Sequence, residues 1–291
     1  MLIRIGFDLI FDIPAPTPMI LMLYTHPSRL GSLSAPEVIQ SNPTVPISTF
    51  TDAYGNRCGR LLAPPGQLRL THEAIVRDSG LPDAVQGDAK QWDVHALPPE
   101  AMQFLFASRY CETDRLSQIA WDLFGNTVPG WTRVQAVCDW VHNNVQFGYQ
   151  FARPNKTAFE VYQERQGVCR DFSHLLISFL RCLNIPARYV TGYLGDIGVP
   201  INPDPMDFSA WTEVFLDGRW YTFDGRHNMP RIGRIVMARG RDAVDVAITT
   251  SFGPSQLTRF NVITDEIPLD EDPMPRPLSA EVSSGAAQIT T

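Results

Sequence analysis

The sequence predicts an α+β fold, in which an all-β domain precedes a core of helices and antiparallel strands. Residues 1–95 consist of short apolar runs, some of them alternating, separated by frequent Pro and Gly. This texture is typical of a small β-sandwich. From about residue 98 apolar residues recur at helical spacing, and beyond Pro186 the pattern returns to strands. Helices followed by an antiparallel sheet are typical of an α+β domain.

The expected strands of the first domain lie between turn-rich segments. They are residues 2–11, 18–24, 45–52, 57–64 and 66–78. The segments 45–52 and 57–64 flank the sequence "AYGN", which predicts a hairpin with a Gly-Asn turn. The frequent Pro residues fit strand edges and connections.

The expected helices of the second domain carry apolar residues three and four positions apart. They are residues 97–110, 114–125, 131–147, 157–167 and 169–183. The last has the strongest apolar stripe, and Asn184 and Pro186 end it. The strands expected after it are 187–194, a hairpin within 206–228, and the segments 231–253 and 257–267.

These patterns divide the chain into three parts. We expect a β-rich domain at residues 1–95 and a core at residues 96–267. Residues 268–291 are rich in Pro, Ser and acidic residues, which predicts a mobile tail.

The composition excludes several classes of protein. Of the 291 residues, 44% are hydrophobic and 19% are charged, a balance typical of a globular protein. The net charge of −7 leaves no basic excess to neutralise phosphates, so we expect no nucleic-acid partner. No apolar run is long enough to span a bilayer, and the first residues lack the pattern of a secretory signal. We therefore expect no membrane association and a cytoplasmic location.

One of the five cysteines stands out as a candidate nucleophile. The set is Cys58, Cys111, Cys138, Cys169 and Cys182, without a CxxC pair or a metal-type Cys/His spacing. We therefore expect no metal or other cofactor. Cys169 lies at the expected start of a helix, where free N–H groups and the helix dipole favour the thiolate and lower the thiol pKa. The alternative is that Cys169 is an ordinary buried helix residue.

A predicted hairpin supplies candidate partners for this thiol. If Asp217-Gly218 forms its turn, Leu216 lies opposite Arg219 and Trp211 lies opposite Asp224. Ser209 then lies on the same face as Asp224, at a spacing that an imidazole could bridge and a serine hydroxyl could not.

His227 is a second candidate partner for Asp224. Strict alternation places it on the opposite face, although Gly225 can end or bulge the strand. The alternative is that His227 only closes a turn. We expect His174, five residues after Cys169, to have a structural role.

These residues carry a resemblance to a known family. The segments "GVCRDFSHLLISFLRCLNIPARYVTGYL" and "DFSAWTEVFLDGRWYTFDGRHN" resemble the bacterial transglutaminase-like cysteine peptidase superfamily. The resemblance covers about residues 98–260, and the β-rich domain is similar to that of two-domain bacterial members. It implies a papain-like core with a Cys-His-Asp triad, in which Cys169 is the nucleophile and Asp224 is the acid. The family's His belongs at the start of a "HAW" run, which is "SAW" here, so Ser209 occupies the His position.

The resemblance leaves two functions open. The first is a cysteine peptidase or amidase that cleaves an amide of a peptide or protein through a Cys169 thioester. His227 or a water held by Ser209 would replace the missing base. The second is a catalytically impaired pseudoenzyme that binds peptides or acts as a scaffold. Trp211, Asp207 and Phe208 are expected to lie at the substrate cleft, while the substrate and the oligomeric state stay open.

Overall fold

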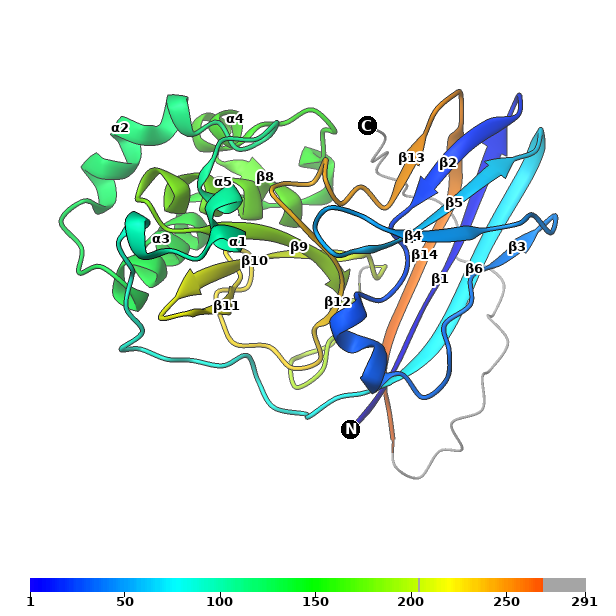
Figure 1. Cartoon of the computed structure of the whole chain (residues 1–291), viewed down its shortest axis with the longest axis horizontal. Helices are drawn as coiled ribbons and strands as arrows, with labels where there is room; N and C mark the ends of the chain where they lie inside the picture. Colours follow the sequence, from blue (N-terminus) through cyan, green and yellow to red (C-terminus); the bar gives the residue numbers. More distant parts are fainter. Residues whose placement is uncertain (204, 269–291) are drawn as a thin grey trace.

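The computed structural model describes residues 1–203 and 205–268. Figure 1 shows the helices on one side of the molecule and a β-sandwich on the other, with strands β9 to β12 between them. The predicted α+β class, with a β-rich N-terminal region and a core of helices and antiparallel strands, is confirmed.

The sandwich consists of two four-stranded sheets. One has the order β14-β1-β6-β3 and the other the order β13-β2-β5-β4. The strands from the N-terminal region are β1 (Leu2–Ile13), β2 (Thr17–Leu21), β3 (Gln40–Asn42), β4 (Ser48–Thr51), β5 (Arg57–Ala63) and β6 (Gly66–Arg77). The predicted hairpin is present as β4 and β5, in which Thr51 pairs with Arg57.

Two strands from the far end of the chain complete this sandwich. They are β13 (Thr249–Ser251) and β14 (Gln256–Ile267), drawn in orange beside the blue and cyan strands in Figure 1. β14 pairs with β1 from Leu2 to Asp12, and β13 pairs with β2. The range 96–267 expected for the core therefore includes two strands that belong to the N-terminal sheets. Strand patterning did not identify them because it predicts strands without naming their partners. The tail expected at 268–291 lies outside the described residues except for Pro268.

The core contains one antiparallel sheet with the order β11-β10-β9-β12. Its strands are β9 (Ala187–Tyr193), β10 (Ser209–Leu216), β11 (Arg219–Phe223) and β12 (Ile235–Gly240). The helices are α1 (Pro99–Met102), α2 (Thr113–Phe124), α3 (Trp131–Asn144), α4 (Ala158–Glu164) and α5 (Cys169–Cys182). Short 3₁₀ turns are Pro27–Ser32, Val94–Ala96, Gln103–Leu105 and Tyr149–Phe151.

One predicted helix is much shorter in the structure. Residues 97–110 form only α1 and the turn Gln103–Leu105, whereas the other four predicted helices are present within a few residues of their expected ends. Phe104 is buried but Phe106 is largely exposed, so this segment has no continuous apolar face.

α5 is the central helix of the core. Its apolar residues Leu175, Leu176 and Phe179 are fully buried, between the sheet and the other helices. The helix ends at Cys182, and Asn184 then adopts a left-handed conformation before Pro186. Because α5 is held on all sides, its first residue has a fixed position relative to β10.

The sandwich and the core sheet share one apolar cluster. Tyr193 of β9, Phe208 before β10 and Met237 of β12 pack with Phe7 of β1 in this cluster. Burial of these large side chains stabilises the contact between the two parts. In the part of the chain that is described, no helix is long and apolar enough to cross a membrane.

Candidate active site

A tight strand-to-helix turn places Cys169 at the first position of α5. Two short parallel strands precede it, β7 (Gln146–Phe147) and β8 (Gln166–Gly167), and Phe147 pairs with Gly167. The Asp171 carboxylate accepts a hydrogen bond from the Val168 N–H at 2.9 Å, which caps the helix. A Cβ on Gly167 would lie 2.6 Å from the Asp171 Cβ, so only glycine fits this turn.

Cys169 is partly exposed, whereas Cys58, Cys111, Cys138 and Cys182 are buried. The backbone N–H of Ala210, in β10, lies close enough to the Cys169 sulfur to favour the thiolate. The predicted position of the thiol at a helix N-terminus is thus present, and β10 passes directly beside it.

The pKa of the Cys169 thiol is nevertheless raised to about 11. Desolvation is the largest cause, and the negative charge of Asp207 adds to it. The positive charge of Arg226 and the Ala210 N–H act in the opposite direction but are weaker. The expectation of a lowered pKa is therefore wrong, because it considered the helix terminus and not burial or the neighbouring carboxylate.

The Asp207 carboxylate lies in the segment just before β10. Its Oδ1 atom is buried and has no hydrogen-bond partner among the described residues. Desolvation raises the pKa of Asp207 to about 6, against the opposing effects of the Phe208 N–H and Arg226. Asp207 thus lies near the thiol, as a cleft residue would.

The other two expected cleft residues are interior. Phe208 is 5% exposed and packs against Tyr193 with ring centroids 5.2 Å apart. Trp211 is 1% exposed, in a small cluster with Val190 and Val236. Neither side chain presents a surface to a substrate in this structure.

The hairpin has the predicted register. Leu216 pairs with Arg219 and Thr212 pairs with Phe223, which continues to Trp211 opposite Asp224. Ser209 is the first residue of β10, is 9% exposed and pairs with Gly192 of β9. No hydrogen bond joins the Ser209 hydroxyl to Cys169 or Asp224, all three of which lie in the described part of the chain.

Asp224 is bound to a cation and an imidazole. Its Oδ2 accepts hydrogen bonds from Arg234 Nη2 at 2.9 Å and bonds His227 Nδ1 at 2.9 Å. Its Oδ1 accepts the backbone N–H groups of Arg226 and His227. Burial alone would raise the pKa of Asp224, but Arg234 and His227 outweigh it and hold that pKa well below its usual range.

A turn after β11 brings His227 to Asp224. The Asn228 N–H donates to the Asp224 carbonyl at 2.7 Å, so the chain from 224 to 228 folds back and strand alternation ends. With Nδ1 on the carboxylate, His227 Nε2 is left for other partners, which is the arrangement of an Asp–His pair in a hydrolase. No hydrogen bond joins His227 to Cys169, and both residues are described.

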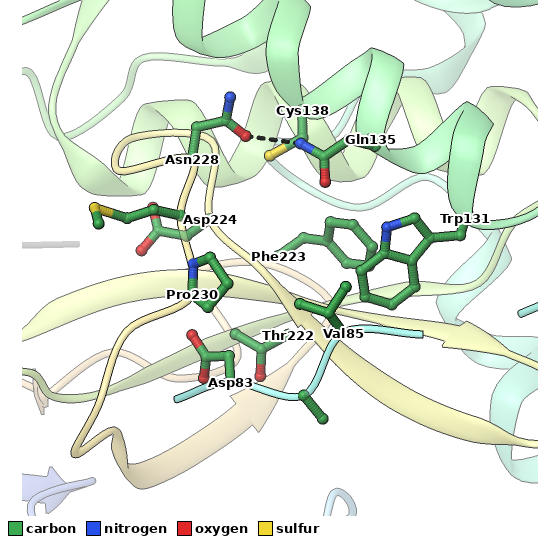
Figure 2. Close-up of a pocket in the computed structure, with 12 residues that line it drawn as sticks. Asp83, Val85, Trp131, Gln135, Cys138, Thr222, Phe223, Asp224, Asn228 and Pro230 are labelled. Atoms are coloured by element: carbon green, nitrogen blue, oxygen red, sulfur yellow. Dashed lines mark hydrogen bonds between the residues drawn. The ribbon is translucent and has the colours of Figure 1, made fainter. Parts of the chain in front are cut away.

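Asp224 also lines a cavity of about 100 Å³. Figure 2 shows Asp224 and Asn228 facing it, with Gln135 of α3 bonded to Asn228 and with Trp131 and Phe223 at the far end. Cys169, Ser209 and His227 are not among its lining residues. The cavity is therefore separate from the thiol.

His174 has the structural role expected of it. Its ring stacks on Tyr110 with centroids 5.1 Å apart, and its Nε2 accepts the Ala243 N–H at 3.1 Å. Desolvation holds the pKa of His174 well below its usual value, so it is neutral. No group of three or more potential metal ligands is present among the described residues.

The comparisons with known proteins identify the family of this chain. The family model of the transglutaminase-like superfamily matches residues 118–225, which include Cys169, Ser209 and Asp224. A solved structure from Cytophaga hutchinsonii, described as a putative cysteine protease, is 30% identical with a TM-score of 0.79. The match covers 96% of this chain and 94% of that one. This chain belongs to the transglutaminase-like superfamily.

Curated relatives match at lower identity. The uncharacterized protein Rv2569c of Mycobacterium tuberculosis is 26% identical over 248 residues, which is 77% of this chain and 78% of that protein. The uncharacterized protein ML0607 of Mycobacterium leprae is 26% identical over 117 residues. In that case the match spans 39% of this chain and 42% of the relative.

Two arginines near Cys169 and Asp224 were missed by the sequence analysis as site residues. Arg234 forms an ion pair with Asp224, and the positive charge of Arg226 acts to lower the pKa of Cys169. Both lie within ten residues after Asp224, in the segment "GRHNMPRIGR". The three arginines of that segment could have predicted these contacts, because a basic segment directly after a buried aspartate supplies ion-pair partners for its carboxylate.

Proposed function

We propose that this protein is a thiol hydrolase of the transglutaminase-like superfamily that cleaves amide bonds of peptides or proteins through a thioester on Cys169. One observation carries the proposal. Cys169 alone among the five cysteines is partly exposed, and it lies at the start of α5 against β10. The 30% identity to a Cytophaga hutchinsonii protein described as a putative cysteine protease supports the same class of reaction.

The proposed base is the Asp224–His227 pair. An imidazole whose Nδ1 is held by a carboxylate has its Nε2 ready to accept and return a proton. The 2.9 Å contact between His227 Nδ1 and Asp224 Oδ2 supports this role. Ser209 occupies the position of the usual imidazole but has no group that titrates near neutral pH, so it is not itself the base.

The reaction would follow thiol acyl transfer. The Cys169 proton passes to His227 Nε2 as the sulfur bonds to the amide carbonyl carbon. His227 then protonates the amine as the carbon–nitrogen bond breaks, which leaves a thioester. A water molecule gives a proton to His227, bonds to the carbonyl carbon and displaces the sulfur, and the proton returns to Cys169.

The test is turnover and acyl trapping. The wild-type protein is incubated with a panel of peptide anilides, and the released amine and any thioester on Cys169 are measured by mass spectrometry. We expect release that is abolished in Cys169→Ala, lowered strongly in His227→Asn and retained in Cys182→Ala. Release that survives in Cys169→Ala would disprove the proposal.

A second function is favoured by the raised pKa of Cys169. A thiol pKa raised to about 11 leaves very little thiolate at pH 7. A pseudoenzyme that binds peptides would fit such an inert thiol. For this function, the wild-type protein must bind peptides without releasing amine, and Cys169→Ala must bind them equally well.

We also propose that the protein works in the cytoplasm. All five cysteines are free thiols, which supports a reducing compartment. Recovery of the native protein in a periplasmic or secreted fraction would contradict this.

A further inference from the structure

Arg226 is held in a fixed position beside the thiol. Its guanidinium carbon lies 3.7 Å from the centroid of the Phe147 ring, a close cation–π contact. Phe147 pairs with Gly167, two residues before Cys169. The backbone of Arg226 is also bound at both ends, since its N–H donates to Asp224 at 3.0 Å and its carbonyl bonds His142 Nδ1 at 2.9 Å.

The guanidinium of Arg226 has no carboxylate within 4.0 Å among the described residues. Other arginines of the core are paired at closer range, such as Arg234 with Asp83 and Asp224 and Arg239 with Glu213. The side chain of Arg226 is only half-buried. One face of its guanidinium is covered by Phe147, and its N–H groups form no ion pair with residues 1–203 or 205–268.

The charge of Arg226 reaches the reacting group. It is the largest favourable contribution to the Cys169 thiolate, and it also stabilises the charged form of Asp207. Asp207 lies beyond ion-pair distance of Arg226, so it does not occupy the guanidinium. A planar cation without an ion-pair partner in the described part of the chain therefore lies within electrostatic range of the nucleophile.

We propose that Arg226 binds a carboxylate of the substrate adjacent to the scissile amide. The substrate class is then acidic amides, in which a free terminal carboxylate or an Asp or Glu side chain flanks the bond that Cys169 attacks. A guanidinium fixed by stacking is well suited to this, because its N–H fork matches a carboxylate in two parallel hydrogen bonds. The proposal rests on Cys169 being the site at which substrate binds, and deepens the function proposed above.

The test compares matched substrates. Peptide pairs that differ only by carboxylate or carboxamide at each position flanking the scissile bond are given to the wild-type protein. At one of these positions we expect the KM of the carboxylate member to be lower than that of the carboxamide member by about tenfold or more. This is the effect expected from one charged hydrogen-bond pair. Arg226→Met should abolish this preference, and Arg226→Lys should retain only part of it.

Arg219 supplies the matched control. It also stacks on an aromatic ring, with its guanidinium carbon 4.5 Å from the Tyr221 centroid, but it is exposed at the hairpin turn and does not act on Cys169. Arg219→Met should keep the carboxylate preference. Equal preference in wild type and Arg226→Met, or loss of preference in Arg219→Met, would overturn the proposal.

Binding to Cys169→Ala separates this inference from hydrolysis. Calorimetry on Cys169→Ala with and without Arg226→Met measures the carboxylate preference when no turnover can occur. An Arg226-dependent preference of about tenfold supports the inference even if the wild type hydrolyses nothing. Hydrolysis by the wild type without any carboxylate preference refutes the inference and leaves the hydrolase function in place.

Discussion

The Asp224 carboxylate accepts a hydrogen bond from the Arg234 guanidinium at 2.9 Å, and the two side chains are only 3% and 6% exposed. Arg234 in turn bonds Asp83 at 2.8 Å, in the connection that leads from the sandwich to the helices. Asp224 therefore ties together the end of β11, the segment before β12 and this connection. Asp224, to which the family resemblance assigns the orienting of a catalytic base, therefore also stabilises the contact between these segments.

We expect Asp224→Asn to lower the free energy of unfolding by about 3 kcal/mol at pH 7, the lower end of the cost of breaking a buried ion pair. Buried Arg234 loses one of its two carboxylate partners and keeps the other, Asp83. The pKa of Asp224 is depressed in the folded state, so its contribution is fully present above the unfolded pKa of about 3.9. The contribution is lost as the pH falls below that value. Urea unfolding of wild type and variant between pH 7 and pH 3 measures both effects.

Asp12→Asn is the control for this measurement. Asp12 is exposed on the sandwich, where its carboxylate accepts a long hydrogen bond from Gln67 Nε2 at 3.4 Å. Its replacement should change the free energy of unfolding by less than about 0.5 kcal/mol. If Asp224→Asn were equally mild, the Arg234 contact would not stabilise the fold.

Removal of the Asp207 charge should make Cys169 more reactive. Among the charges that raise the pKa of Cys169, that of Asp207 has the largest effect, so Asp207→Asn should move that pKa below about 11. The thiolate fraction should rise above about pH 6, where the wild-type Asp207 is charged, and should not change below it. The measurement is the rate of iodoacetamide alkylation of Cys169 against pH, followed by peptide mass spectrometry.

Asp217→Asn is the matched change at the hairpin turn, where the side chain is exposed and away from the thiol. It should leave the alkylation profile of Cys169 unaltered. An unchanged profile in Asp207→Asn would mean that the two groups do not interact.

Ser209→His should increase the reactivity of Cys169. Ser209 is adjacent to Ala210, whose N–H reaches the sulfur, so an imidazole at this position lies close to the thiol. General acid–base help of this kind is worth about 10²- to 10⁴-fold in turnover, and we expect a gain toward the lower end because Arg234 and His227 already bind Asp224. Amide hydrolysis and alkylation rates are compared in wild type, Ser209→His and Ser209→Ala. If Ser209→Ala gave the same gain, its cause would be the space left by the serine hydroxyl and not the imidazole.

The sequence predicted the local parts of this site better than its electrostatics. The start of α5 follows from the apolar spacing of Leu175, Leu176 and Phe179, and the hairpin register follows from the Asp217-Gly218 turn. Both depend on residues close together in the chain. The pKa of Cys169 depends instead on burial and on Asp207, which lies 38 positions away in the sequence, and no periodicity reports such a contact.

The same limit applies to the sandwich. Residues 1–95 have clear strand patterns, but the partner of β1 on one side is β14, more than 200 positions later. Alternation shows that a strand will have a buried face and leaves its neighbours undetermined. His227 is a third example, because the turn that brings it to Asp224 interrupts the alternation from which its face would be predicted.

The domain division leads to an expectation about fragments. Residues 1–95 lack β13 and β14, so β1 and β2 would each lose one neighbouring strand. We expect this fragment to unfold without a cooperative transition, whereas the chain of residues 1–268 unfolds cooperatively, as followed by circular dichroism in urea. Cooperative unfolding of the 1–95 fragment would restore it as an independent domain.

Gly167→Ala should disturb the start of α5 and with it the thiol. The added Cβ would lie 2.6 Å from the Asp171 Cβ and 2.7 Å from its Oδ2, so the cap on the Val168 N–H must shift. We expect a loss of about 1–3 kcal/mol in the free energy of unfolding, the usual cost of overpacking, and an altered alkylation rate of Cys169 in the folded protein. Gly87→Ala is the control, because its Cβ would meet nothing within 4 Å. If both variants matched the wild type in urea unfolding and alkylation, the close approach of Gly167 to Asp171 would not be what positions Cys169.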